Sequence, residues 1–148
     1  MLHWIFKGFH ELTPSELYLT MQLRQEVFVL EQKCLYLDAD GKDLLSHHLM
    51  GFQDKTLVAY SRLVSPGISY LEPSIGRVIT ARGYRHNGYG KELMRKSIEG
   101  IEKLYGKTPI RIGAQVYLMK FYETFGFKQD GIPYLEDRID HVKMLRQL

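Results

Sequence analysis

The sequence has 148 residues, of which 45% are hydrophobic and 25% are charged. This length and composition are typical of a single globular domain and exclude a disordered, collagen-like or low-complexity chain. Lysine and arginine total 20 against 17 acidic residues, and the resulting charge of +3 suits a protein that meets small anions without favouring nucleic acid. No apolar run approaches the roughly 18 residues of a membrane-spanning helix, so we expect no membrane association.

Cysteine usage and the first residues indicate the compartment. Cys34 is the only cysteine, which excludes an internal disulfide and favours a reducing environment. The segment 1–7 lacks the basic region and the apolar core of a secretory signal peptide. We therefore expect a cytoplasmic protein with one domain over residues 1–148.

The first third of the chain predicts a strand followed by a helix. Aromatic residues alternate loosely over 3–9, as they do in a strand. Thr13 then offers a helix N-cap, Pro14 occupies the first helical position, and Glu16 completes a capping box. Polar residues over 33–46 predict a loop. The residues expected on the apolar face of this helix are Leu17, Tyr18, Met21 and Phe28.

The rest of the chain predicts strands interrupted by two further helices. The expected elements are, in order, strands at 49–53, 56–64 and 74–80, a long helix ending near Tyr105, a strand at 109–116, a short helix at 117–124, and one or two strands from 127 onward. This order predicts an α/β (α+β) protein. We expect a mixed central sheet flanked by helices on both faces, not a doubly wound parallel sheet.

The most informative segment is the turn Arg85-His86-Asn87-Gly88-Tyr89-Gly90, between a predicted strand and the long helix. Its glycines let backbone N–H groups converge, and the first N–H groups of a helix attract anions. With Arg85 and Lys91 beside it, the turn predicts a pyrophosphate site, although a lone G-x-G also occurs at tight helix starts. Glu92 excludes a P-loop, and Leu93 stands where a dinucleotide fingerprint needs a third glycine.

These residues resemble a known family. Arg85-x-x-Gly88-x-Gly90 is similar to the central motif of the GNAT superfamily of acetyl-CoA-dependent N-acetyltransferases, and Phe121-Tyr122 with Gly126-Phe127 resembles its later helix segment. The resemblance covers residues 57–130 well and implies the GNAT fold, with splayed central strands. Residues 24–34 and the tail with Glu136-Asp137 are similar to the ElaA-like branch of this superfamily.

The resemblance implies a binding site for acetyl-CoA. Pantetheine would bond to the strand at 74–80, through backbone groups of Val78 and Thr80, and the pyrophosphate would bond to the turn. Gln115 stands where many members of the family carry an asparagine that contacts the cofactor, and it keeps the amide chemistry. The implied cofactor-binding residues are Val78, Ile79, Thr80, Arg85, His86, Asn87, Gly88, Tyr89, Gly90, Lys91 and Gln115.

The implied reaction is direct attack of an amine on the thioester. Tyr122 stands at the family's tyrosine position and is the expected acid for the leaving thiolate, unless it only packs the short helix on the sheet. The sequence does not choose the base. The candidates are Glu31, Asp40, His48, Glu72 and His141, each with an ordinary structural explanation as well. We place Glu31 and His48 with Tyr122 as the expected catalytic residues, and Arg24 and Arg62 at the acceptor pocket.

Several alternatives remain. The acceptor is expected to be a primary amine of a small molecule or a peptide, and the resemblance also makes a homodimer an expectation. No metal is expected, because Asp38-Ala39-Asp40-Gly41 lacks the spacing of a calcium loop and His47-His48 lacks a second ligand pair for zinc. A thiol nucleophile at Cys34 is disfavoured. The rival functions are a non-catalytic acyl-CoA-binding module or sensor, and a structural domain that binds no CoA.

Overall fold

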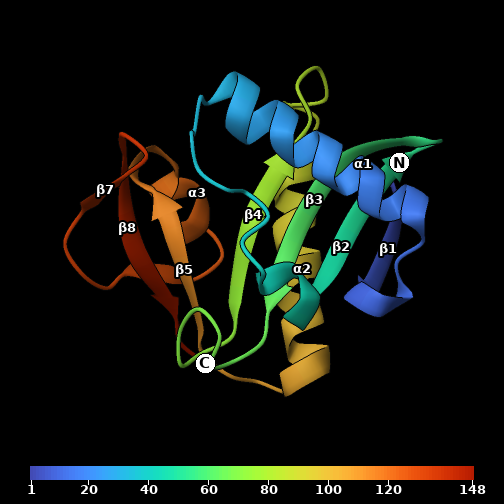
Figure 1. Ribbon diagram of the computed structural model, residues 1–148. Helices are drawn as coiled ribbons and strands as arrows, with labels where there is room; N and C mark the ends of the chain where they lie inside the picture. Colours follow the sequence, from blue (N-terminus) through green and yellow to red (C-terminus); the bar gives the residue numbers. More distant parts are fainter.

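The computed structural model describes all residues from Met1 to Leu148 and contains two four-stranded antiparallel sheets (Figure 1). In the first sheet the order is β1 (His3–Gly8), β2 (Ser46–Gln53), β3 (Thr56–Val64) and β4 (Ser74–Thr80). In the second sheet β8 (Ile139–Arg146) lies between β5 (Ile110–Gln115) and β6 (Phe127–Gln129), and β7 (Tyr134–Glu136) also pairs with β8. The C-terminal strand therefore holds the second sheet together.

β4 and β5 run in the same direction and diverge (Figure 1). They meet at one end only, where the amide of Arg111 donates to the carbonyl oxygen of Pro73 at 3.1 Å. β4 also carries a bulge opposite β3, at Arg77, whose φ is +49°. The expected GNAT fold is confirmed, and its mixed character comes from this parallel junction between two antiparallel sheets.

Helices cover both faces of the first sheet (Figure 1). α1 (Pro14–Arg24) lies on one face and begins with the predicted capping box, in which Glu16 N donates to Thr13 Oγ1 at 3.1 Å. It continues into a π-helical segment, Gln25–Glu31, which the sequence pattern did not predict. Tyr18 is 70% exposed, so its expected place on the apolar face is wrong.

α2 (Tyr89–Tyr105) packs on the opposite face through four buried apolar side chains, Leu93, Met94, Ile98 and Ile101. The short helix α3 (Met119–Glu123) follows β5 and lies against the second sheet. No helix combines the length and the apolar run that crossing a membrane requires. The two sheets and their helices thus form one body with a gap between β4 and β5.

Candidate active site

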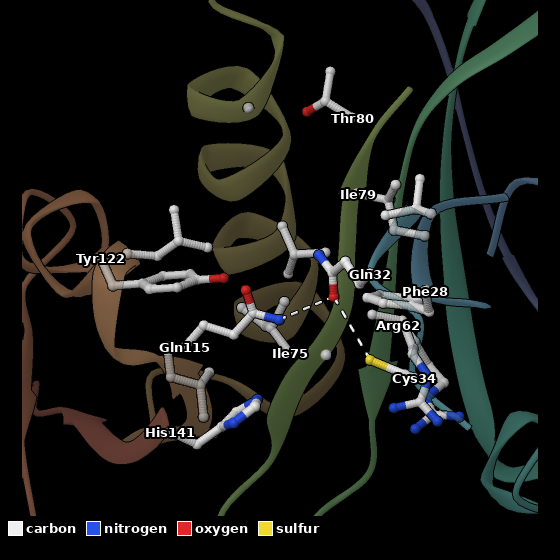
Figure 2. Close-up of a pocket in the computed structure, with 18 of the residues that line it drawn as sticks. Phe28, Gln32, Cys34, Arg62, Ile75, Ile79, Thr80, Gln115, Tyr122 and His141 are labelled. Carbon is white, nitrogen blue, oxygen red and sulfur yellow. Dashed lines mark hydrogen bonds between the residues drawn. The ribbon is translucent and has the colours of Figure 1, made fainter. Parts of the chain in front are cut away.

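A cleft of about 1060 Å³ lies where the two sheets diverge (Figure 2). Its walls come from β4, the turn before α2, β5, α3, the π-helical segment and the connection between β7 and β8. The volume is at the upper end of the roughly 300–1,000 Å³ that small-molecule sites occupy. Because β4 is the last strand of its sheet, backbone groups on its cleft side have no partner strand. An extended ligand can pair with such an edge.

One end of the cleft is the N-terminus of α2. Gly88 is the N-cap, with φ +78°, and no side chain caps the first turn of the helix. The first helical N–H groups therefore have no intrahelical partner and point toward an anion site. His86 also has a left-handed φ, of +71°, which brings the turn close to the helix start. The wall here includes Gly88, Tyr89, Gly90 and Lys91.

Arg85 connects this end of the cleft to the π-helical segment. Its Nε donates to the carbonyl oxygen of Thr80 at 3.0 Å, and its two terminal nitrogens donate to the carboxylate of Glu31 at 2.6 and 2.9 Å. These bonds hold the pKa of Glu31 below its ordinary value. A carboxylate whose pKa is lowered is a weaker proton acceptor, so Glu31 acts here as an anion bound by Arg85.

Tyr122 extends from α3 into the middle of the cleft (Figure 2). Its ring packs edge-on against Phe121 and Phe127. The residue is 8% exposed, and burial raises the pKa of the phenol to about 12. The hydroxyl makes no hydrogen bond within the protein and points toward the space between the sheets. It is therefore a protonated donor over the whole physiological range.

A pair of amides spans the cleft beside Tyr122 (Figure 2). Nε2 of Gln115, at the end of β5, donates to Oε1 of Gln32 at 3.1 Å. The Sγ of Cys34 lies 3.9 Å from the same oxygen. The two glutamines are 83 residues apart in the chain, so this contact exists only because the fold brings the π-helical segment over β5.

His141 on β8 faces the other half of the cleft (Figure 2). Its Nδ1 lies 2.8 Å from the carbonyl oxygen of Ile139. A carbonyl only accepts, so Nδ1 carries the proton in the neutral ring and Nε2 keeps its lone pair. Nε2 lies 3.5 Å from a carboxylate oxygen of Glu136, and the ring stacks on Tyr134. This arrangement leaves a basic nitrogen facing the cleft.

The comparisons with known proteins decide the family. The sequence profile described as an acetyltransferase (GNAT) domain matches residues 23–148. The chain belongs to the GNAT acetyltransferase family. The GNAT fold implies an acyl-CoA co-substrate, and the free edge of β4, the uncapped α2 and the cleft volume fit such a ligand.

Relatives of this GNAT protein extend over its whole length. ElaA of Escherichia coli is 38% identical over 150 residues, covering 100% of this chain and 98% of ElaA. A UPF0039 protein of Synechocystis is 41% identical over 145 residues, covering 97% of this chain and 94% of that protein. The expected membership of the ElaA-like branch is confirmed.

Solved structures agree with these relatives. An acyl-CoA N-acyltransferase from Pseudomonas aeruginosa superposes with a TM-score of 0.95 at 42% identity and covers 99% of each chain. Escherichia coli ElaA gives a TM-score of 0.94, at 38% identity, over 99% of this chain and 100% of that chain. These findings show that the GNAT protein is an acyltransferase, against both non-enzymatic alternatives.

Two of the expected site residues of this GNAT protein do not line the cleft. His48 is fully buried between the Tyr60 hydroxyl, at 2.7 Å, and the carbonyl oxygen of Asp43, at 3.0 Å. Both ring nitrogens are engaged, and burial lowers the pKa of this histidine. Asn87 is exposed and donates to the carbonyl oxygen of Tyr84 at 3.3 Å. Val78, Ile79, Thr80 and the other expected cofactor-binding residues do line it.

Several other charged candidates belong to a network of alternating ion pairs, here called the charge network. It consists of Arg24, Arg62, Arg77, Asp38, Asp40 and Asp43. Arg24 is completely buried and does not line the cleft, so its expected place at the acceptor pocket is wrong. Arg62 does line the cleft, but Asp40 and Asp43 neutralise it at 2.8 and 3.0 Å.

The sequence reasoning missed several residues of the cleft wall. Glu72, a base candidate, does not line the cleft. Its Oε1 pairs with Nε of Arg111 at a distance of 3.0 Å. The missed residues are Gln32, Tyr36, Tyr70 and Tyr134. Gln32 lies within the segment that resembles the ElaA-like branch, whereas the three tyrosines carry no local signal. The structure shows no group of three histidine, cysteine, aspartate or glutamate side chains placed to hold a metal ion.

Proposed function

We propose that this acyltransferase moves an acetyl group from acetyl-CoA to a primary amine, which attacks the thioester directly. The observation that carries the proposal is the position of the Tyr122 hydroxyl. The Tyr122 side chain is largely buried, which raises the pKa of the phenol to about 12, and its hydroxyl has no hydrogen-bond partner in the protein and points into a cleft that has an uncapped helix N-terminus at one end. Such a site can hold the two ends of acyl-CoA while a proton donor faces the reacting thioester.

The donor half of the cleft supplies two kinds of backbone contact. The free edge of β4 at Val78, Ile79 and Thr80 pairs with the amides of pantetheine as an added strand. The N–H groups at the start of α2, with Arg85 and Lys91, hold the pyrophosphate. Gln115, whose amide already reaches across the cleft, lies where it can hydrogen-bond the pantetheine arm.

Tyr122 and His141 divide the proton chemistry. The amine nitrogen attacks the thioester carbon, and the carbon–sulfur bond breaks with its electrons moving to sulfur. Tyr122 donates a hydrogen bond to the sulfur as that charge develops, since its pKa of about 12 keeps it protonated. His141 accepts the proton of the ammonium at Nε2, directly or through water, and Glu136 stabilises the resulting imidazolium. Of the base candidates that line the cleft, Glu31 and Asp40 are bound by arginines, whereas His141 has no lysine or arginine partner.

The test is Tyr122→Phe, measured by thiol release with acetyl-CoA and a panel of amines. The variant should lower kcat by about 10²–10⁴-fold, the range typical of a lost proton donor, while the Kd for acetyl-CoA stays unchanged. Tyr18→Phe, on the exposed side of α1, is the matched control and should behave as the parent protein. A Tyr122→Phe variant that turns over at the parental rate would remove Tyr122 from the reaction.

The expectation of a cytoplasmic protein stays a prediction.

A further inference from the structure

The half of the cleft remote from α2 differs from the donor half in charge. Two carboxylates, Glu136 and Asp137, lie on its wall at the turn between β7 and β8. Neither forms an ion pair with a lysine or an arginine, and the one titratable neighbour of Glu136 within 4 Å is the His141 ring, at 3.5 Å. By contrast, Arg62 on the same wall is paired with aspartates. The wall here therefore offers two carboxylates that are free to pair with a bound cation.

The field of these carboxylates reaches across the cleft. Burial, and then the charges of Asp137 and Glu136, raise the pKa of the Cys34 thiol on the opposite wall. Burial and the charge of Glu136 also raise the pKa of Tyr70. Burial, which disfavours charge of either sign, is the larger cause of both pKa shifts, and the carboxylate contributions show only that Glu136 lies near both groups and Asp137 near the thiol. Among the cations nearby, Lys42 bonds to the hydroxyl of Ser69 at 3.0 Å, Lys143 lies 5.6 Å from the centre of the Tyr70 ring, and Arg111 pairs with Glu72 and Asp130.

Polar groups without protein partners face the same space. The phenol oxygens of Tyr70 and Tyr134 converge over Gly113, each 3.1 Å from the position that a Cβ at residue 113 would take. His141 is 8% exposed, and its Nε2 lies 3.5 Å from the Glu136 carboxylate. Oxygen acceptors and aromatic faces around two free carboxylates form an environment that suits an ammonium group.

We infer that the acceptor is a dication, a linear alkyl diamine whose far ammonium is held by Glu136 and Asp137 while its near amine reacts beside Tyr122. Tyr70 and Tyr134 accept hydrogen bonds from the held ammonium. This inference rests on the proposed function, because it names the acceptor class of the same site. An acceptor carboxylate is not favoured, because Arg62 and Arg77 already bind Asp40 and Asp38 at 2.8 Å.

The experiment compares three amines of equal chain length: putrescine with two positive charges, n-butylamine with one, and γ-aminobutyrate with an added carboxylate. Steady-state kinetics at saturating acetyl-CoA should give a kcat/KM for putrescine about tenfold or more above that for n-butylamine, mostly through KM. γ-Aminobutyrate should be the poorest substrate. The advantage of putrescine should also decrease with salt, since the carboxylates are partly exposed.

The variants test the binding of the far ammonium separately from the chemical reaction of the near amine. Asp137→Asn should remove most of the preference for putrescine and leave n-butylamine unchanged. Asparagine tolerates the left-handed φ of +48° at position 137, so the turn is kept. Asp140→Asn is the matched control, since it makes the same charge change beside the same turn but does not line the cleft. Equal loss with both amines would indicate an effect through His141 and would overturn the inference.

A binding measurement keeps this inference separate from the proposed function. Calorimetric titration of putrescine into the CoA-bound protein should show binding that Asp137→Asn weakens and Asp140→Asn retains. Putrescine binding without turnover of any amine would support the dication site and overturn the proposed function. Turnover of n-butylamine as good as that of putrescine would keep the proposed function and overturn the dication site.

Discussion

A single ion pair at the donor end has the largest consequence for co-substrate binding. Arg85 and Glu31 are about one-third exposed, and their bidentate contact at 2.6 and 2.9 Å uses the guanidinium that faces the anion site. A pyrophosphate entering that site must share or replace these bonds. The Glu31 carboxylate is therefore a competitor of the ligand for Arg85.

Glu31→Gln should bind acetyl-CoA more tightly, by about two- to fivefold, because partly exposed ion pairs are worth roughly 0.2–1 kcal/mol. Isothermal titration at low and high salt measures this, and the gain should be smaller at high salt. Glu26→Gln, exposed on the same π-helical segment and unpaired, is the control. The kcat at saturation should stay unchanged, whereas a loss of kcat would restore Glu31 as the base.

At the scale of the elements, α2 begins at the cleft and packs close to the sheet. Gly100 provides that closeness, since a Cβ there would lie 2.8 Å from Cδ2 of Leu63 and 3.2 Å from Cζ of Phe6. The helix axis therefore lies nearer β1 and β3 than a larger residue would allow. Its N-terminus takes its place at the cleft because of this contact.

Gly100→Val should lower the free energy of unfolding by about 1–3 kcal/mol, the usual cost of adding atoms to a packed core. Urea denaturation of the parent and the variant measures the difference. Glu99→Val, at the exposed neighbouring position, measures how much valine lowers the free energy of unfolding through its helix propensity, without a packing clash. A Gly100→Val variant no less stable than Glu99→Val would show that α2 is not closely packed at this position.

For the molecule as a whole, the charge network ties the loop after the π-helical segment to both the first helix and the first sheet. Its aspartates come from residues 38–43, and its arginines come from α1, β3 and β4. Burial opposes ionisation of Asp40, but its bonds with Arg62 and the charges of Arg62 and Arg77 outweigh that and lower its pKa to about 2. The pKa of Asp43 is lowered in the same way by Arg24 and Arg62.

Stability should therefore depend on pH in the acid range. A carboxyl whose folded pKa lies below its unfolded value of about 3.9 stabilises the fold above that value and loses this contribution as pH falls toward 2. Thermal midpoints measured from pH 6 to pH 2 should fall more steeply for the parent than for Asp40→Asn. Asp54→Asn, in the exposed β2–β3 turn, should follow the parent curve. Parallel curves for all three proteins would contradict a stabilising role of Asp40.

Local patterns predicted a large part of this molecule correctly. Two of these features are the capping box at Thr13 and Glu16 and the glycine turn at Gly88. Each depends on backbone groups within about four residues, so neighbouring residues in the sequence determine its geometry. The same holds for the strand hairpin at β2 and β3. These local features carried the resemblance to the GNAT family and the location of the donor half.

The surroundings of the base candidates could not be predicted from local sequence patterns. His48 and His141 are both histidines on strands, yet one is buried between Tyr60 and Asp43 and the other faces the cleft. Which outcome applies depends on partners that are distant in the sequence or on the other side of a sheet. Likewise, the ion pair of Glu31 with Arg85, 54 residues away, could not be predicted from either segment alone.

The sequence by itself determined most of the elements and the family, because each rests on contacts between near neighbours in the chain. Only the tertiary structure decided the acceptor half of the cleft. Its residues are brought together when β8 inserts between β5 and β6 and places His141 and Glu136 opposite Cys34. Such proximity is set by strand pairing and packing over the whole chain, and no spacing within one segment encodes it.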